Sequence, residues 1–244
     1  MKTGIQFYSF MPEIEADGFD KALDIAARCG VDGVELFNRY DIPAIKYRKA
    51  LNNAGVTCCG THNVLQPLLC DLDHVMEYNY ALGNTMVLCC YLMPDERGTK
   101  DKWLRAADSM NRTAATLKHN GFEFAYHNHD FEFAETFDGE CGMDILLNNT
   151  DPALVGIELH IGQLPKFGLD QAAYVKKLGR RLKILHAHTF LTDENDPFDS
   201  APSIEAAKEF DVGWAIVENV FPAPTDIAAV KKSVGAIRSM ALGL

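Results

Sequence analysis

A short apolar run followed by an amphipathic helical pattern recurs eight times along the 244 residues of the chain. The runs are apolar almost throughout, which is typical of strands in a parallel sheet that is covered on both faces. Alternating strands and helices predict such a sheet, and eight units in about 250 residues match the size of a (β/α)8 barrel, or TIM barrel. We therefore expect residues 1–244 to form one barrel domain. The expected strands span residues 4–10, 32–37, 56–63, 84–91, 122–133, 154–164, 182–190 and 214–220.

An open, doubly wound sheet is the competing fold for the same alternation. That fold normally carries a glycine-rich turn after its first strand, and the corresponding segment here reads YSFMPEIEADG. No linker or low-complexity stretch divides the chain. The weakest units of the expected barrel are the fifth, with the short helical stretch CGMDILLNNT, and the seventh, where LTDENDPFDSAPS reads as a loop.

The charge of the chain argues against two classes of partner. The formal net charge is −11 and the sequence pI is about 5.1, with no basic stripe. An acidic protein of this kind is a poor binder of nucleic acid and of anionic membranes. We therefore expect neither as a partner, and the sequence leaves the oligomeric state open.

The start of the chain and its cysteines bear on its location. The segment MKTGIQFYSF lacks the pattern of a signal peptide, and no stretch approaches the roughly 20 apolar residues of a membrane span. Seven cysteines include two adjacent pairs but no CxxC spacing, which predicts reduced, buried thiols. These features predict a protein of the reducing cytoplasm.

Polar side chains gather where the expected strands end, which is the catalytic face of this barrel. Six of the eight histidines lie at such positions, and only His74 and His119 lie in helical stretches. A buried imidazole or carboxylate must be paired or must coordinate something. Imidazoles and carboxylates that converge on one mouth suit Zn²⁺, Mn²⁺, Fe²⁺ or Co²⁺. The residues concerned include Glu35, His62, His127, His129, Glu132, Glu158, His160, His186, His188 and Glu218.

The strand-end motifs resemble those of the xylose isomerase-like TIM barrels, a superfamily of sugar isomerases and epimerases that also contains inosose dehydratases and apurinic-site endonucleases. GVDGVELF resembles the second-strand signature, YHNHDFEF the fifth, ILHAHTF the seventh and WAIVENV the eighth. The resemblance covers nearly the whole chain. It implies one divalent metal held by side chains from strands five to eight. Carried across, these ligands fall on Glu132, His160, His186 and Glu218.

The chain departs from the family pattern at three places. The sixth-strand ligand is normally an Asp in a pattern like LDVYW, and here the segment reads LHIGQ, with His160 in that place. Loss of one negative charge shifts the expected metal from Mg²⁺ towards Zn²⁺, Mn²⁺, Fe²⁺ or Co²⁺. The Lys-Asp of the seventh-strand pattern HLKD is His188-Thr189, and the Gly-rich turn before strand eight reads APSIEAAKEF. The resemblance therefore implies the fold and the metal more fully than the substrate.

The resemblance implies chemistry at a carbon next to a carbonyl group. Glu132 and Glu218 would act as an acid–base pair, one removing a proton and the other returning it on the opposite face, as in an isomerase or epimerase. An inosose-type dehydratase shares the first step and then expels a β-hydroxyl. A non-catalytic sugar-binding barrel is the alternative outside the enzymes, and an apurinic-site endonuclease is disfavoured by the charge. The residues expected to bind the substrate or relay protons are Glu35, His62, His127, His129 and His188.

The expected substrate is a small, neutral or weakly charged sugar, keto sugar or inositol-like polyol. A phosphate group would need Arg, Lys or a glycine-rich loop at a helix start. The nearest basic residues to the expected strand ends are Arg39 and Lys166, and both are typical of solvated loop positions. His188 stands where the family carries a Lys on strand seven.

Overall fold

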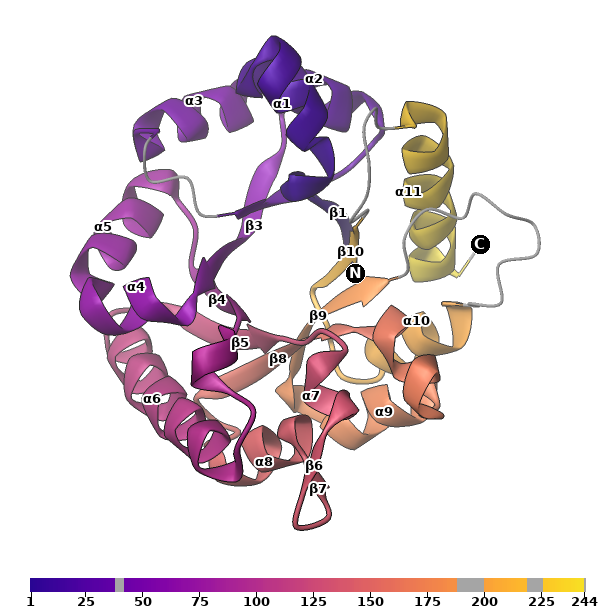
Figure 1. Ribbon diagram of the computed structural model, residues 1–244. Helices are drawn as coiled ribbons and strands as arrows, with labels where there is room; N and C mark the ends of the chain where they lie inside the picture. Colours follow the sequence, from indigo (N-terminus) through magenta and orange to yellow (C-terminus); the bar gives the residue numbers. More distant parts are fainter. Residues whose placement is uncertain (38–41, 188–199, 219–225, 244) are drawn as a thin grey trace.

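The computed structural model confirms the (β/α)8 barrel (Figure 1). It describes residues 1–37, 42–187, 200–218 and 226–243. Within these ranges eight parallel strands close in the order β1, β10, β9, β8, β5, β4, β3, β2, and β2 pairs with β1. Closure excludes the open sheet. The barrel strands are β1 (Lys2–Gln6), β2 (Gly33–Phe37), β3 (Thr57–Val64), β4 (Met86–Tyr91), β5 (Glu123–His127), β8 (Val155–His160), β9 (Leu182–Ala187) and β10 (Trp214–Val217).

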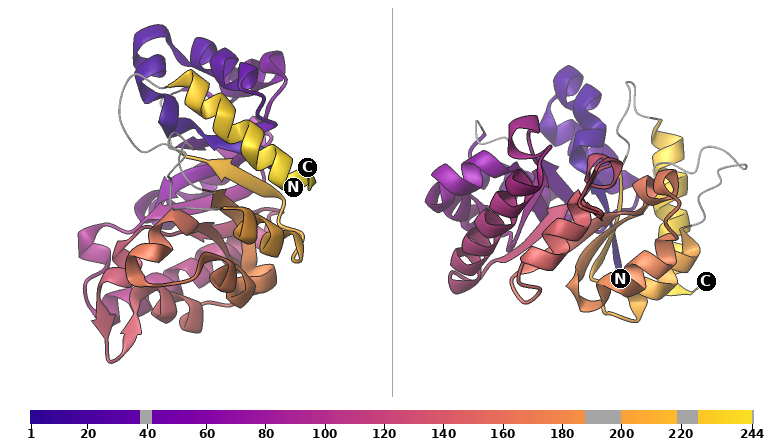
Figure 2. Two further views of the ribbon diagram at one scale, coloured as in Figure 1. Left: turned by 90° about the vertical axis from the view of Figure 1, so that its right-hand side faces the viewer. Right: turned by 60° about the horizontal axis from the view of Figure 1, so that its bottom comes forward.

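Helices form a ring outside the strands, and the small hairpin of β6 (Thr136–Phe137) and β7 (Glu140–Cys141) projects from it (Figures 1 and 2). Gly55 and Gly83 end two of the helices in the left-handed conformation that glycine tolerates best. The α-helices are α1 (Met11–Asp17), α2 (Phe19–Arg28), α3 (Ala44–Ala54), α4 (Leu65–Cys70), α5 (Leu72–Leu82), α6 (Lys100–His119), α7 (Phe131–Ala134), α8 (Gly142–Asn149), α9 (Gln171–Leu178), α10 (Ala201–Lys208) and α11 (Ile227–Leu242). Short 3-10 helices are η1 (Phe7–Phe10), η2 (Pro94–Glu96), η3 (Ile161–Phe167) and η4 (Gly179–Arg181).

Three strands end earlier than the sequence predicts. β1 stops at Gln6, β5 at His127 and β8 at His160, and each apolar run continues as the short helix η1, α7 or η3. The prediction of strands to residues 10, 133 and 164 is therefore wrong. Side chains turn the backbone at these points; the Gln6 side chain, for example, accepts a hydrogen bond from the Tyr8 N–H at 2.7 Å. Most apolar residues beyond these turns, such as Phe7, Phe133 and Ile161, are still buried, so hydrophobicity alone did not mark the strand end.

The barrel interior has two layers of different chemistry. We call the apolar cluster the lower layer and the polar cluster towards the carboxyl ends of the strands the upper layer. Because side chains two residues apart on a strand share a face, Ala125 and Ile184 of the lower layer are followed by His127 and His186 of the upper layer. The lower layer comprises Cys59, Leu88, Ala125, Ile184 and Ile216. The upper layer comprises Gln6, Glu35, His62, His127, Glu158 and His186, which are all buried.

The cysteines are free thiols, as their spacing predicts. Cys29, Cys59 and Cys89 are buried, whereas Cys70 is exposed, so the expectation of burial does not hold for every thiol. Among the described residues, none of the helices is both long enough and apolar enough to cross a bilayer.

Candidate metal centre

Four potential metal ligands come from four neighbouring strands. His127 and His160 end β5 and β8, His186 lies on β9, and Glu218 directly follows β10. One donor atom from each side chain lies within 4.8 Å of the donor atoms of the other three. The three imidazoles are buried, and 13% of the Glu218 side chain is exposed. We call these four residues the outer group.

A second set of potential ligands lies deeper in the barrel. It consists of His62, His127, Glu158 and His186, whose donor atoms also lie within 4.8 Å of one another. We call it the inner group. It shares His127 and His186 with the outer group, so the hydrogen bonds of these two imidazoles decide which set is free to bind a metal.

Buried carboxylates engage one nitrogen of each shared imidazole. Glu158 Oε2 lies 2.9 Å from His127 Nδ1 and 2.8 Å from His62 Nε2. His186 Nε2 lies 2.9 Å from Glu35 Oε2 and 3.3 Å from Glu158 Oε1. A carboxylate that holds one nitrogen of an imidazole commonly orients the other nitrogen towards a metal. Nε2 of His127 and Nδ1 of His186 are then the nitrogens left for a metal.

The outer group is completed by Glu218. Its Oε2 lies 3.2 Å from His186 Nδ1 and 3.5 Å from His160 Nδ1. These are the distances of groups that already converge on one point, and three imidazoles with one carboxylate are a usual ligand set for Zn²⁺ and related ions. The outer group is therefore the better candidate, with Glu35 and Glu158 as its supports.

Burial and neighbouring charges set the protonation of the centre. Burial opposes the positive charge of His186, but Glu158 and Glu35 outweigh it and raise the pKa of His186 well above its ordinary value. Burial likewise opposes ionisation of Glu158, but His186 and His62 hold its pKa well below the usual range. Burial lowers the pKa of His127, so this imidazole is neutral, the form that binds metals. Burial opposes ionisation of Glu218, but its hydrogen bond with His186 and its electrostatic interactions with the three imidazoles together outweigh burial and lower the pKa of that carboxyl.

The motif YHNHDFEF builds a corner between β5 and α7. Its Tyr126 hydroxyl donates to Glu132 Oε1 at 2.6 Å, and the His129 N–H donates to Glu132 Oε2 at 2.8 Å. The Asn128 side chain accepts a hydrogen bond from the His160 N–H at 2.9 Å, which ties the end of β5 to the end of β8. Polar residues follow this apolar strand because they hold the corner and present His127 to the barrel interior.

The structure does not bring Glu132 into either ligand group. It lies on α7 with both carboxylate oxygens hydrogen-bonded, and it is fully buried. Burial raises the pKa of Glu132 to about 7, against the hydrogen bonds from Tyr126 and the backbone. In the outer group His127 occupies the strand-five place. The alternation of side chains along a strand could have identified His127 as facing the barrel interior, because it lies two residues after Ala125, as His186 lies two residues after Ile184.

A cavity of about 740 Å³ opens above the outer group. It contains three of the expected substrate-binding residues, whereas Glu35 lies beneath them in the upper layer. The aromatic residues of its wall were missed by the sequence analysis because they lie at or beyond strand ends, where no motif marks them. His188 and Arg39 fall outside the described residues. The lining residues are Gln6, Tyr8, Phe37, His62, Val64, Cys90, Tyr91, His127, His129 and Glu218.

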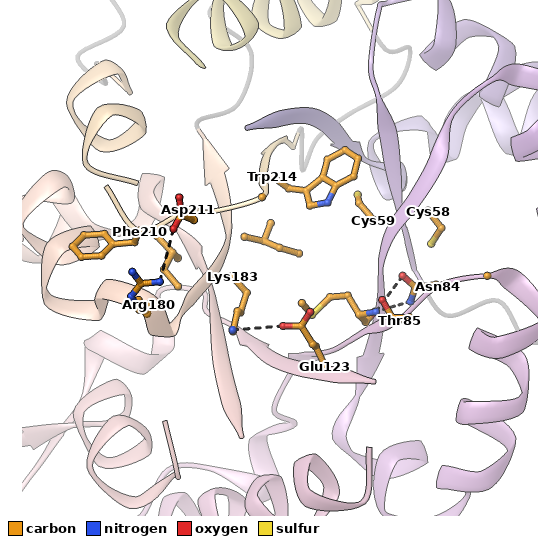
Figure 3. A pocket seen from close by; sticks show the side chains of 15 residues that line it. Cys58, Cys59, Asn84, Thr85, Glu123, Arg180, Lys183, Phe210, Asp211 and Trp214 are labelled. Atoms are coloured by element: carbon orange, nitrogen blue, oxygen red, sulfur yellow. Dashed lines mark hydrogen bonds and ion pairs between the residues drawn. The ribbon is translucent and has the colours of Figure 1, made fainter. Parts of the chain in front are cut away.

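A second cavity, of about 520 Å³, lies at the opposite end of the barrel (Figure 3). Its charged side chains pair with each other, Lys183 with Glu123 at 3.5 Å and Arg180 with Asp211 at 3.8 Å. Trp214 lies over Gly33, where any Cβ would approach the indole ring to 2.7 Å. This end of a TIM barrel normally serves stability, and its paired charges fit that role.

The fold and the site together define a (β/α)8 barrel with a candidate divalent-metal centre at the carboxyl ends of its strands. The chain belongs to the xylose isomerase-like TIM barrel family, whose profile matches residues 23–238. An inosose dehydratase of Bacillus anthracis is 20% identical over 237 residues, which span 88% of this chain and 76% of the relative.

Solved structures that share the fold include two that differ in their similarity to this chain. A sugar phosphate isomerase/epimerase from Parabacteroides distasonis superposes with a TM-score of 0.86 at 20% identity, over 96% of this chain and 94% of the other. An IolI protein with a bound zinc atom superposes with a TM-score of 0.67 at 14% identity, over 100% and 97% of the two chains.

Proposed function

We propose that the protein is a divalent-metal-dependent enzyme that isomerises or epimerises a small sugar or cyclic polyol. The observation that carries this proposal is the convergence of His127, His160, His186 and Glu218, of which His127 and Glu218 line the cavity. The names of the similar proteins, a sugar phosphate isomerase/epimerase and an inosose dehydratase, support the same class of substrate. The acidic net charge supports a small-molecule substrate over nucleic acid, and the free thiols support a cytoplasmic location.

The outer group would hold one Zn²⁺, Mn²⁺, Fe²⁺ or Co²⁺ in preference to Mg²⁺. Three imidazole nitrogens and one carboxylate are too soft and too weakly charged a set for Mg²⁺, which prefers oxygen ligands. The zinc in the IolI structure supports this choice. When bound, such an ion polarises a carbonyl oxygen and stabilises the negative charge that develops beside it.

Glu218 is proposed as the general base. Among the described residues that line the cavity it is the one carboxylate. Its Oε2 faces His186 and His160, so the other oxygen, Oε1, would take the proton from the carbon next to the carbonyl. Return of this proton to the former carbonyl carbon, together with transfer of the hydroxyl proton from one oxygen to the other, completes an isomerisation.

His129 is proposed to bind a substrate hydroxyl, and His188 stays a proposal on the resemblance alone. His62 lines the cavity, but Gln6 engages its Nδ1 at 3.2 Å and Glu158 its Nε2 at 2.8 Å. Nδ1 of His129 is buried and has no hydrogen-bond partner among the described residues. Burial and the adjacent His127 lower the pKa of His129 to about 2, so the neutral ring can accept a hydrogen bond. We assign Glu132 the positioning of His129 through its N–H, in place of the ligand and base roles that the resemblance implies.

A neutral substrate remains the proposal. The described residues that line the cavity include neither Lys nor Arg. Lys166 lies on η3 with 56% of its side chain exposed, and it contacts Gln163 and Asp130. A phosphate bound in the cavity would therefore lack the cationic partners that it normally requires.

Dehydration is the second candidate reaction, favoured by the curated inosose dehydratase relative. It shares the removal of a proton by Glu218 and differs in the loss of a hydroxyl one carbon further on. Mass spectrometry of the product separates the two reactions, because dehydration removes one water and isomerisation leaves the mass unchanged.

Hydrogen exchange tests the proposed function. We expect metal-loaded protein to exchange a carbon-bound hydrogen of its substrate with D₂O, in a screen of keto sugars, sugar phosphates and inososes with Mn²⁺, Zn²⁺ or Co²⁺. Chelator-treated protein serves as the control and should lose the exchange, which added metal should restore. Absence of exchange with every compound would favour a sugar-binding barrel. A preference for a sugar phosphate over its parent sugar would contradict the neutral substrate.

Glu158 gives a separate prediction about the support of the metal centre. Glu158→Gln should weaken metal binding by about 10–100-fold, because the carboxylate that orients His127 and His186 is lost. Competition with a chromogenic chelator measures the affinity without any substrate. The control is Glu123→Gln at the lower end of β5, an exposed carboxylate far from the centre, which should leave the affinity unchanged. Equal affinities of the two variants would refute the supporting role.

A further inference from the structure

We propose that the cavity contains an outer subsite for a second ring of the substrate, formed by Tyr8, Phe37 and Tyr91. The proposal rests on the proposed function, because the first ring is the one that reaches the outer group. The substrate class is then a sugar or cyclic polyol that carries a further ring with an apolar face, as in an aryl glycoside or a disaccharide.

The cavity changes character from its floor to its mouth. At the floor Gln6, His62 and His127 are at most 7% exposed, whereas Tyr8 at the mouth is 50% exposed. A single sugar ring has only about a dozen non-hydrogen atoms, whereas pockets of roughly 300–1,000 Å³ hold drug-sized ligands. The volume of about 740 Å³ lies in the upper half of that range and leaves room beside a first ring.

Tyr8 is held at the mouth by the structure around it. Its neighbours Phe7 and Phe10 on η1 are fully buried in the core, and Tyr8 lines the cavity instead. The Gln6 side chain accepts a hydrogen bond from the Tyr8 N–H and so fixes the backbone of Tyr8. The ring meets Phe37, at the end of β2, edge to face with 5.5 Å between centroids. A large ring held half in solvent by such contacts is typical of a ligand-binding surface.

Tyr91 adds a second fixed ring to the wall. It packs edge to face on His129 and on Phe131, with 5.2 Å between centroids in both pairs. Arg97 donates to the Tyr91 hydroxyl at 3.3 Å, and its guanidinium lies 3.8 Å from the Phe131 ring centroid. Arg97 thus helps to fix the positions of the Tyr91 and Phe131 rings. Rigid aromatic faces bind aryl rings and the apolar faces of sugars at little entropic cost.

Paired ligands that differ only in the second ring test the subsite. Titration calorimetry on metal-loaded protein would compare methyl β-glucoside with phenyl β-glucoside and with cellobiose. We expect at least one of the two-ring ligands to bind roughly three- to tenfold more tightly than the methyl glucoside. The ratio should fall to about one in Tyr8→Ala and persist in Tyr8→Phe, which keeps the ring. Tyr80→Ala is the matched control, since Tyr80 is 81% exposed on α5 and does not line the cavity.

The outcomes separate the subsite from the proposed function. Tighter binding of the phenyl compound identifies an aryl substituent, and tighter binding of cellobiose identifies a second sugar. Equal or undetectable binding of all three ligands, or a ratio that survives Tyr8→Ala, overturns the subsite. The ratio of affinities is measured without turnover and therefore tests the subsite alone. If the proposed function is wrong, metal-dependent hydrogen exchange will be absent although the ratio of affinities persists.

Discussion

His186→Ala is expected to reduce bound metal from about one ion per chain to below about one tenth. His186 belongs to both ligand groups and contacts Glu35, Glu158 and Glu218. Loss of a residue that merely orients a ligand weakens binding by about 10–100-fold, so loss of this direct ligand should exceed about 100-fold. Elemental analysis of protein purified without chelator measures the effect, and hydrogen exchange should disappear with the metal.

The control for this change is His119→Ala, at the exposed end of α6, which should keep the full metal content. Removal of His186 also takes one partner away from each of the buried carboxylates Glu35 and Glu158, so circular dichroism must establish that the variant is folded. His160→Ala provides a milder route, because His160 approaches Glu218 only at 3.5 Å. Unchanged metal content in both folded variants would refute the outer group.

Glu218→Gln is expected to slow hydrogen exchange by about 10²–10⁴-fold, the usual contribution of a general base. The amide keeps the shape of the side chain and one oxygen for the metal, but it cannot accept the proton. Metal content should therefore fall much less than in His186→Ala, and this contrast separates the base from the ligand role.

Glu135→Gln is the matched control, since Glu135 is an exposed carboxylate just after α7 and should not affect exchange. Full exchange in Glu218→Gln would exclude Glu218 as the base. Glu132, hydrogen-bonded on both oxygens, would then need to be tested as the resemblance implies.

The barrel was predictable because the strands are largely apolar runs and several helices end at a glycine, as α3 does at Gly55 and α5 at Gly83. The strand ends were less accessible to sequence reasoning. Phe131 and Phe133 continue the apolar run of β5, but they pack from α7 after the backbone has turned at Asn128. Local hydrophobicity reports burial and does not report this turn.

The uncertainty about where each strand ends also limited which site residues could be identified from the sequence. His160, His186 and Glu218 lie at or next to strand ends, and the structure brings them together as the motifs implied. The strand-five residue depended on where β5 ends, so the motif pointed to Glu132 while the interior receives His127. Glu158 could not be paired from sequence, because its partner His62 lies 96 residues away and meets it only across the closed barrel.

The division of the interior into two layers constrains how this protein can change over evolutionary time. Removing one partner from a buried ionic network costs about 3–5 kcal/mol, whereas replacing the whole network by apolar residues of similar volume is often neutral or stabilising. The upper layer can therefore be exchanged as a set far more easily than residue by residue. A descendant that abandons the reaction should have lost Glu35, Glu158 and His186 together, while the lower layer, which closes the barrel on its own apolar contacts, is retained.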